Sequence, residues 1–178
     1  FGARSVLAER RQGTLRRLLA SAAPPGGVLA GKALAAFTLG TASMLVMWLA
    51  TTLVFGADWG DPVAVVALTV SSVLSAIGIT ALVVTLAKTD EQAEGYSSLV
   101  VFVLALLGGN FVYLAQLPEA LQRAALFTPN GWALRGFVDL VADGGGLATV
   151  AAPVAVTLAV GLVTGGLALY RARRMVAA

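Results

Sequence analysis

Residues 5–32 read SVLAERRQGTLRRLLASAAPPGGVLAGK and make the longest polar, charged segment of the chain. A long run without any charged residue begins directly after it, at Ala33. Six of the chain's 12 Lys and Arg lie at or before its last residue: Arg4, Arg10, Arg11, Arg16, Arg17 and Lys32. A basic segment that leads into an apolar run is typical of the cytosolic side of a membrane helix. We therefore expect residues 1–32 to lie in the cytosol and to meet a partner there.

The spacing of apolar residues in this segment predicts a short amphipathic helix. Leu15, Leu18 and Leu19 repeat at i, i+3 and i+4, which places them on one face of a helix. Thr14 is a suitable N-cap for this helix. The Pro and Gly residues at positions 24–27 predict its end. We expect the helix to lie near the membrane surface.

The composition indicates an integral membrane protein. Of the 178 residues, 58% are hydrophobic and only 12% are charged, and the mean hydropathy is +0.88. Soluble domains carry about 25% charged residues. The absence of Cys and His excludes disulfides, thiolate chemistry and the usual zinc sites. The chain begins with Phe1 and shows no signal-peptide pattern, so we expect residues 1–178 to be one transmembrane domain that is truncated at its N-terminus.

Four runs of the chain are long and apolar enough to cross a bilayer, which takes about 20 residues. Backbone groups in hydrocarbon must be hydrogen-bonded within the protein, and no run alternates with the period of a barrel strand. The sequence therefore predicts an all-α integral membrane fold with four transmembrane helices, at residues 33–55, 62–87, 95–117 and 147–170.

The distribution of Lys and Arg predicts how these helices are oriented. With residues 1–32 inside, only Arg123 and Arg135 lie outside. The inside then holds the other ten, which are Arg4, Arg10, Arg11, Arg16, Arg17, Lys32, Lys88, Arg171, Arg173 and Arg174. This bias follows the positive-inside rule and explains the net charge of +3 without nucleic acid. We expect a multi-pass protein of the cell (plasma) membrane, with the N-terminal segment and the C-terminus in the cytosol.

The connection between the third and fourth runs, residues 118–143, is long and semi-apolar. Pro118 begins one short helical piece, and Thr128 can cap a second piece with Pro129 at its first position. The second piece has an apolar face and a charged face, formed by Leu134, Phe137, Val138 and Val141 and by Arg135 and Asp139, respectively. Both pieces are too short to span a bilayer, so we expect re-entrant helices at the outer leaflet.

Residues 26–32, GGVLAGK, match the spacing G-x-x-x-x-G-K of a phosphate-binding loop. That loop needs Ser or Thr at the next position to hold magnesium, and it needs a strand before it. Here Ala33 and a membrane helix follow. We therefore expect no nucleotide to bind there, and we expect Lys32 to extend toward the lipid headgroups.

The four runs contain no Asp, Glu, Lys or Arg, which argues against a proton- or ion-coupled transporter. Asn110, which follows Gly108 and Gly109, is the most polar side chain in a run. It has two interpretations, a contact with cargo or an interhelical hydrogen bond, and the second is the commoner use of such a group. Gly161 and Gly165 form a G-x-x-x-G pair, which fits either a dimer seam or packing within one subunit.

The carboxylates are expected to be solvated loop charges. A pair of carboxylates can perform acid–base chemistry, but the sequence offers no His or Cys and no dry pocket to support it. We therefore predict no catalytic residue, no metal site and no enzyme activity in this chain. On the inner side, Asp90, Glu91 and Glu94 form either a solvated turn or a second contact with a partner.

Two separated motifs resemble one known family. Residues 9–19, with Gly31 and Lys32 after them, follow the pattern E-R-x-x-G-T-L-x-x-L-L and then G-K. This pattern resembles the cytosolic loop of type-2 exporter permeases of ATP-binding-cassette transporters. Residues 118–122 and 128–134 resemble the family's outer re-entrant region, and the likeness covers essentially the whole chain. Members usually have six membrane helices, which implies that two of them precede the four predicted here.

The resemblance implies a division of labour between subunits. A separate ATPase subunit would bind ATP and magnesium, and this chain would bind no cofactor. Two permease copies, expected as a homodimer, would enclose the export path of a lipophilic compound such as a drug, an antibiotic or a lipid-like molecule. Residues 9–19 would form the coupling helix that docks on the ATPase, through Glu9, Arg10, Gly13, Thr14, Leu15 and Leu18. The re-entrant region would include Pro118, Pro129, Asn130, Trp132 and Phe137.

Two other classes of function remain open. The first is a structural or lipid-handling membrane protein that works without an ATPase. The second is a membrane-embedded enzyme acting at the outer face, which would need a cluster of catalytic groups that the sequence does not supply.

Overall fold

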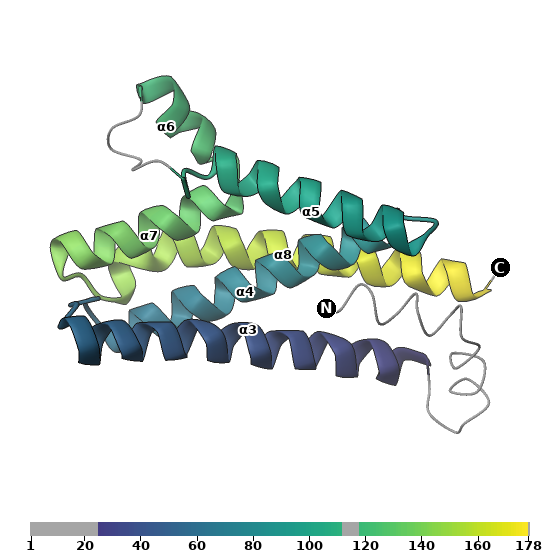
Figure 1. The fold of residues 1–178 in the computed structure, drawn as a ribbon, viewed down its shortest axis with the longest axis horizontal. Helices are drawn as coiled ribbons and strands as arrows, with labels where there is room; N and C mark the ends of the chain where they lie inside the picture. Colours follow the sequence, from purple (N-terminus) through teal and green to yellow (C-terminus); the bar gives the residue numbers. More distant parts are fainter. Residues whose placement is uncertain (1–24, 112–117, 178) are drawn as a thin grey trace.

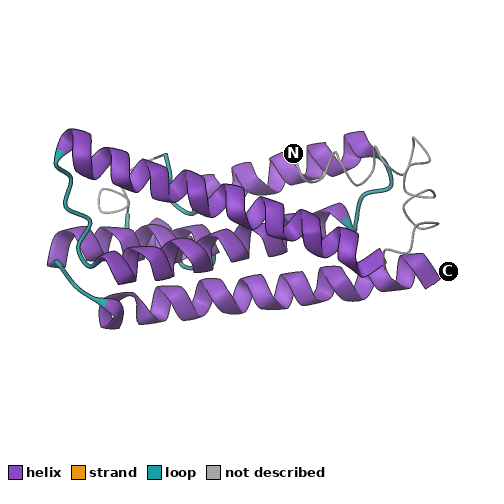
Figure 2. Ribbon diagram, turned by 90° about the horizontal axis from the view of Figure 1, so that it is seen from below, coloured by secondary structure: helices purple, strands orange, loops and turns teal. Residues whose placement is uncertain are grey.

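A computed structural model describes residues 25–111 and 118–177, and within them it contains six α-helices and no β-strand. Figures 1 and 2 show the long helices lying side by side along the long axis of the molecule. The helices are α3 (Pro25–Phe55), α4 (Pro62–Val84), α5 (Asp90–Leu107), α6 (Glu119–Ala125), α7 (Pro129–Asp143) and α8 (Leu147–Ala177). The predicted all-α class is therefore confirmed for the residues that the structure describes.

Three of these helices contain segments that are long and apolar enough to cross a membrane: Gly31–Phe55, Pro62–Val84 and Leu147–Arg174. They confirm three of the four predicted runs as helices. The first helix begins at Pro25, well before the predicted start at Ala33. Proline suits the first position of a helix because its fixed φ is already helical and its missing N–H would be unpaired there in any case.

The third predicted run, residues 95–117, is not one continuous helix. Helix α5 begins earlier, at Asp90, where the side chain of Thr89 accepts a hydrogen bond from the backbone N–H of Gln92. It ends at Leu107, with Gly108 as its C-cap. Gly109 then adopts a φ of +84°, a conformation that favours glycine. The prediction was wrong about this end, residues 112–117 lie outside the described part, and a fourth membrane span is not confirmed.

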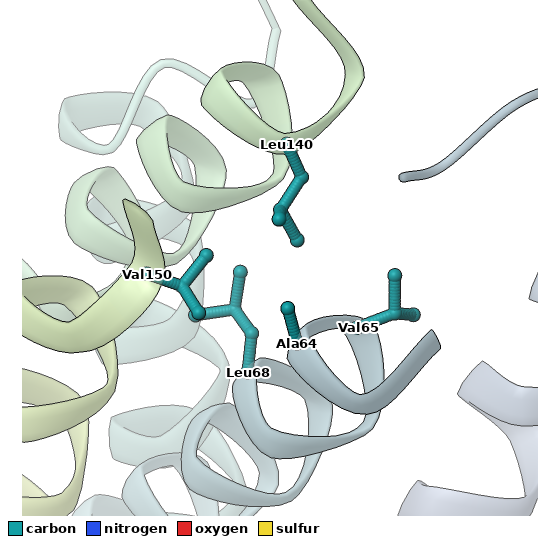
Figure 3. Close-up of a cluster of buried hydrophobic side chains, with 5 residues drawn as sticks. All are labelled: Ala64, Val65, Leu68, Leu140 and Val150. Carbon is teal, nitrogen blue, oxygen red and sulfur yellow. The ribbon is translucent and has the colours of Figure 1, made fainter. Parts of the chain in front are cut away.

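The central helix is α4, which packs against α3, α5, α7 and α8. At one end of α4, five buried side chains from three helices form a cluster (Figure 3). Ala64, Val65 and Leu68 come from α4, Leu140 comes from α7 and Val150 comes from α8. Trp48, Trp59, Phe137 and Val154 pack around this cluster. The cluster therefore joins the start of α4 to the region predicted to be re-entrant.

Small residues allow α4 and α8 to approach each other closely. A Cβ on Gly161 would lie 2.9 Å from the backbone of Leu74 and Ser75, and a Cβ on Gly78 would lie 2.5 Å from the Gly161 carbonyl oxygen. A β-carbon at Gly165 would come within 3.9 Å of the Gly78 Cα. Of the two interpretations of the Gly161–Gly165 pair, the structure supports packing within one subunit.

Candidate functional site

The six residues predicted to contact an ATPase lie outside the described part of the chain: Glu9, Arg10, Gly13, Thr14, Leu15 and Leu18. What the structure does describe is the end of the bundle next to them in sequence. There α3 begins, α4 ends, α5 begins and α8 ends, as Figure 1 shows at the C-terminal side of the molecule. This basic end, as it is called from here on, carries Lys32, Lys88, Arg171, Arg173 and Arg174.

The opposite end of the bundle carries the other two described basic residues, and both are paired with an acid. Arg123 lies 3.2 Å from the carboxylate of Glu119 on α6, and Arg135 lies 3.7 Å from that of Asp139 on α7. Arg135 and Asp139 therefore share a face, as the sequence predicted. The uneven distribution of Lys and Arg along the sequence thus becomes an uneven distribution between the two ends of the bundle.

The turn between α4 and α5 at the basic end is held by its own side chains. Thr89 Oγ1 accepts from the Gln92 N–H at 3.2 Å, and Gln92 Oε1 accepts from the Lys88 N–H at 3.0 Å. Ala93 is buried beneath the turn, while Glu91 and Glu94 are exposed. These two hydrogen bonds fix the backbone at the start of α5, from which Glu91 and Glu94 extend.

At the opposite end, α6 and α7 follow the predicted pattern closely. Pro118 immediately precedes α6, and Thr128 Oγ1 accepts from the Gly131 N–H at 3.0 Å, with Pro129 as the first residue of α7. The indole Nε1 of Trp132 donates to the Leu126 carbonyl at 2.7 Å. Trp132 thus ties α7 to the end of α6.

The face of α7 that packs inward differs in part from the predicted one, since Phe137 packs on the buried cluster but Val141 does not. Val141, predicted to lie on the apolar face, is 55% exposed, whereas Leu140 is fully buried. Gly136 faces α4 so closely that a Cβ would lie 2.8 Å from Leu68 Cδ2. Gly136 and Leu140, at i and i+4, therefore lie on the side of α7 that faces α4. Glycine at position 136 allows α4 to approach because it has no side chain.

Phe137 contacts Trp59, which no local sequence pattern indicated as its neighbour. Its ring lies 5.9 Å from that of Trp59, edge to face, and Trp59 Nε1 donates to Thr51 Oγ1 at 3.1 Å. The next residue, Gly60, has a φ of +75°, and a Cβ there would lie 2.9 Å from the Leu140 carbonyl oxygen. The α3–α4 connection is thereby held against both the end of α3 and helix α7.

The predicted group Gly108, Gly109 and Asn110 lies in the turn after α5. Gly108 and Gly109 are buried, and a Cβ on Gly108 would lie 2.5 Å from the Cβ of Asn130 on α7. The structure therefore brings together two groups of residues that the sequence indicated separately. Asn110 is exposed, and its backbone N–H donates to the Ala105 carbonyl at 3.0 Å.

Within residues 25–111 and 118–177, no three His, Cys, Asp or Glu side chains come together as metal ligands would. The described part consists of apolar helices with one end that carries most of the Lys and Arg and one end built from the shorter helices α6 and α7. This arrangement is typical of a membrane protein.

Comparison with known proteins agrees with this arrangement. The family described as ABC-2 family transporter protein matches residues 1–170. The linearmycin resistance permease protein LnrN of Bacillus subtilis (strain 168) is 28% identical over 160 residues, which cover 90% of this chain and 42% of LnrN. The chain thus spans less than half the length of this relative, and no solved structure matches it. The chain belongs to the ABC-2 family of transporter proteins as a membrane-spanning permease.

Proposed function

We propose that this chain is part of the permease subunit of an ATP-driven exporter that moves a lipophilic compound out across the cell membrane. The cargo class would be a drug, an antibiotic or a lipid-like molecule. The observation that carries the proposal is the family match over residues 1–170. The relative named as a linearmycin resistance permease supports an exported toxic compound as the cargo.

The power for transport would come from a separate ATPase subunit that binds ATP and magnesium. In this proposal, the ATPase docks on residues 9–19, which lie shortly before α3 in the sequence. Closure of an ATPase acts on a membrane domain only through a contact that differs between the two states of the complex. The uneven charge of the bundle supports placing this segment, the basic end and the C-terminus in the cytosol.

The packing offers a route by which motion of α3 reaches the opposite end. A Cβ on Gly40 of α3 would lie 3.0 Å from Val73 Cγ1 of α4, so the two helices are in close contact near their middles. Helix α4 is in turn packed tightly on α8 and contacts α7 through Leu68 and Gly136. In this proposal, a push on α3 would reach α4 through the contact between Gly40 and Val73.

The second permease copy, most simply identical to the first, would complete the export path. Many large apolar side chains on α3 and α5 are exposed, including Leu53, Phe55, Phe102 and Leu106. Lipid and a second copy are the two surroundings that such faces fit. Gly108, Gly109 and Asn110, at the end of α5, would lie near the cargo path.

Co-purification and reconstitution test this function. The full-length protein is purified in mild detergent, its bound proteins are identified, and the complex is reconstituted for ATPase measurements with and without lipophilic compounds. We expect an ATPase subunit to accompany the permease and its activity to rise with cargo. A stable, folded permease without any ATPase would instead favour a structural or lipid-handling membrane protein.

A further inference from the structure

The last four turns of α8 present an apolar stripe that ends in a positive charge. Val163, Leu167, Tyr170 and Arg174 follow one another at i, i+4, i+7 and i+11, so they share one face of the helix. Val163, Leu167 and Tyr170 are 61%, 49% and 55% exposed. Gly161, on the other side of α8, is buried against α4. The stripe therefore faces away from the rest of the described bundle.

Gly166 lies beside this stripe and leaves an open position there, because it has no side chain. A Cβ on Gly166 would meet no atom within 4 Å. Gly166 lies four residues after Leu162 and four residues before Tyr170, and both of these side chains are well exposed. An apolar face with an open position between two large side chains has room for a flexible hydrocarbon chain.

The charge at the end of the stripe is part of a cluster. Arg171, Arg173 and Arg174 are all exposed, and within the described part of the chain none of them is ion-paired with a carboxylate. The guanidinium carbon of Arg174 lies 4.8 Å from the centre of the Tyr170 ring, in cation–π contact. A guanidinium in cation–π contact can still donate its N–H groups to a phosphate, which guanidinium groups bind bidentately.

The length of α8 places the cluster at the depth of lipid headgroups. The apolar segment Leu147–Arg174 has 28 residues, so it is about 42 Å long at 1.5 Å per residue. A bilayer is ~40–45 Å thick when its headgroup regions are included. Tyr170, one turn before Arg174, then lies at the interface where aromatic side chains with a polar tip concentrate.

We propose that this surface binds an anionic phospholipid. One acyl chain lies along Leu162, Gly166 and Leu167, and the phosphate meets Arg171 and Arg174. Charge complementarity selects this occupant, because three arginines that no carboxylate of the described residues neutralises attract an anionic headgroup more strongly than a zwitterionic one. The proposal depends on the chain being a membrane protein and does not depend on ATP-driven export.

Lipid binding to the full-length protein tests the proposal. The protein is stripped of lipid in detergent and titrated with phosphatidylglycerol or with phosphatidylcholine of the same acyl chains, and bound lipid is counted by native mass spectrometry. We expect phosphatidylglycerol to bind more tightly. The triple variant Arg171→Gln, Arg173→Gln, Arg174→Gln should lose affinity by about fivefold per arginine. The matched control, Arg123→Gln with Arg135→Gln, should bind as the wild type does, because those arginines are paired with carboxylates at the opposite end.

A second variant distinguishes a site that fits the acyl chain from a general attraction between the arginines and anionic lipid. Gly166→Leu changes no charge and fills the open position, so it should weaken phosphatidylglycerol binding while the protein stays folded. Equal binding of the two lipids, or wild-type binding by both the triple variant and Gly166→Leu, overturns the proposal. A disulfide-linked dimer formed by Leu167→Cys would show that a second copy covers this face. Loss of a bound protein subunit from the triple variant would show that an acidic protein is the occupant, and either result also overturns it.

Discussion

Thr157 on α8 and Ser71 on α4 join the two most closely packed helices by a hydrogen bond of 2.9 Å between their hydroxyl oxygens. Both side chains are buried, at 0% and 1% exposure. Thr157 Oγ1 also lies within 2.8 Å of the Pro153 carbonyl of its own helix, and Ser71 Oγ donates to the Leu68 carbonyl at 3.0 Å. Each hydroxyl therefore keeps a partner within its own helix when the bond between helices is lost.

This arrangement predicts a small coupling energy between the two hydroxyls. In a double-mutant cycle of Thr157→Val and Ser71→Ala, we expect about 0.6 kcal/mol, the usual value for hydrogen bonds between membrane helices. Unfolding in mixed micelles measures it. Thr164→Val is the control, since its hydroxyl bonds the Val160 carbonyl of its own helix at 2.7 Å. A coupling energy above ~2 kcal/mol would contradict the expectation that each hydroxyl keeps a partner within its own helix.

Gly161 should be far more sensitive to a methyl group than Gly95 is. A Cβ at Gly161 would lie 2.9 Å from the backbone of α4, whereas a Cβ at Gly95 would meet nothing within 4 Å. Gly161→Ala should therefore destabilise by roughly 1–3 kcal/mol, the cost of overpacking. Gly95→Ala should be neutral or stabilising by up to about 1 kcal/mol, because alanine is the better helix former. Thermal unfolding of the two purified variants compares them, and equal stabilities would contradict the close α4–α8 packing.

Phe137→Arg should harm folding or export more than Arg135→Ala does. Phe137 meets Trp59 edge to face and packs on the buried cluster, whereas the Arg135 side chain is 53% exposed and paired with Asp139. An arginine costs roughly 2.5–3.5 kcal/mol at the centre of a membrane helix and less near the interface. Expression level and transport of the two variants are the measurements. Equal tolerance would count against the inward placement of Phe137.

Single cysteines should label from opposite sides of the membrane, since the chain has none of its own. Thr89 and Gly145 are poor positions, because Thr89 caps α5 and a Cβ at Gly145 would collide with Thr149. Lys88 and Ala120 are exposed at the two ends. An impermeant maleimide should label Ala120→Cys in intact cells and Lys88→Cys only in inverted vesicles. Labelling of both in intact cells would refute the proposed orientation.

Local rules predicted local features of this fold. Uncharged runs located the helices, and the sequence Thr128-Pro129 located the start of α7, because capping depends only on residues within one turn. The same reasoning placed Arg135 beside Asp139. Local reasoning failed at the end of α5, because the absence of charges does not reveal the turn that Gly108 and Gly109 form inside an apolar run.

These local rules could not predict contacts between residues that are far apart in the sequence. Trp59 and Phe137 are far apart in the sequence, and no local pattern relates them. The inward face of α7 was predicted correctly at Phe137 but not at Val141 or Gly136, because large apolar residues were expected along it, whereas the close approach of α4 requires a glycine. Whether an exposed surface faces lipid or a partner subunit depends on other molecules, so the fold of one chain does not distinguish these two surroundings.

The proposed coupling segment is distinguished from a simple lipid-bound helix by the type of mutation that harms it. Docking on an ATPase depends on shape and on specific pairs, so Glu9→Ala, Leu15→Asp and Gly13→Pro should each reduce cargo-stimulated ATPase activity by roughly fivefold or more, the size of ordinary coupling between sites. Gly13→Pro acts by fixing a wrong backbone geometry. The subunit should still insert, because none of these positions lies in an apolar run.

A helix that only binds anionic headgroups would respond in the opposite way. Its binding depends on total positive charge and on buried apolar area, so removal of the acidic Glu9 would be harmless or helpful, and Arg16→Gln with Arg17→Gln would be harmful. The reconstituted complex of full-length subunits is therefore measured with both sets of variants. If Glu9→Ala and Gly13→Pro leave stimulation and transport intact while the arginine variants weaken membrane binding, residues 9–19 bind the lipid surface and the ATPase docks elsewhere.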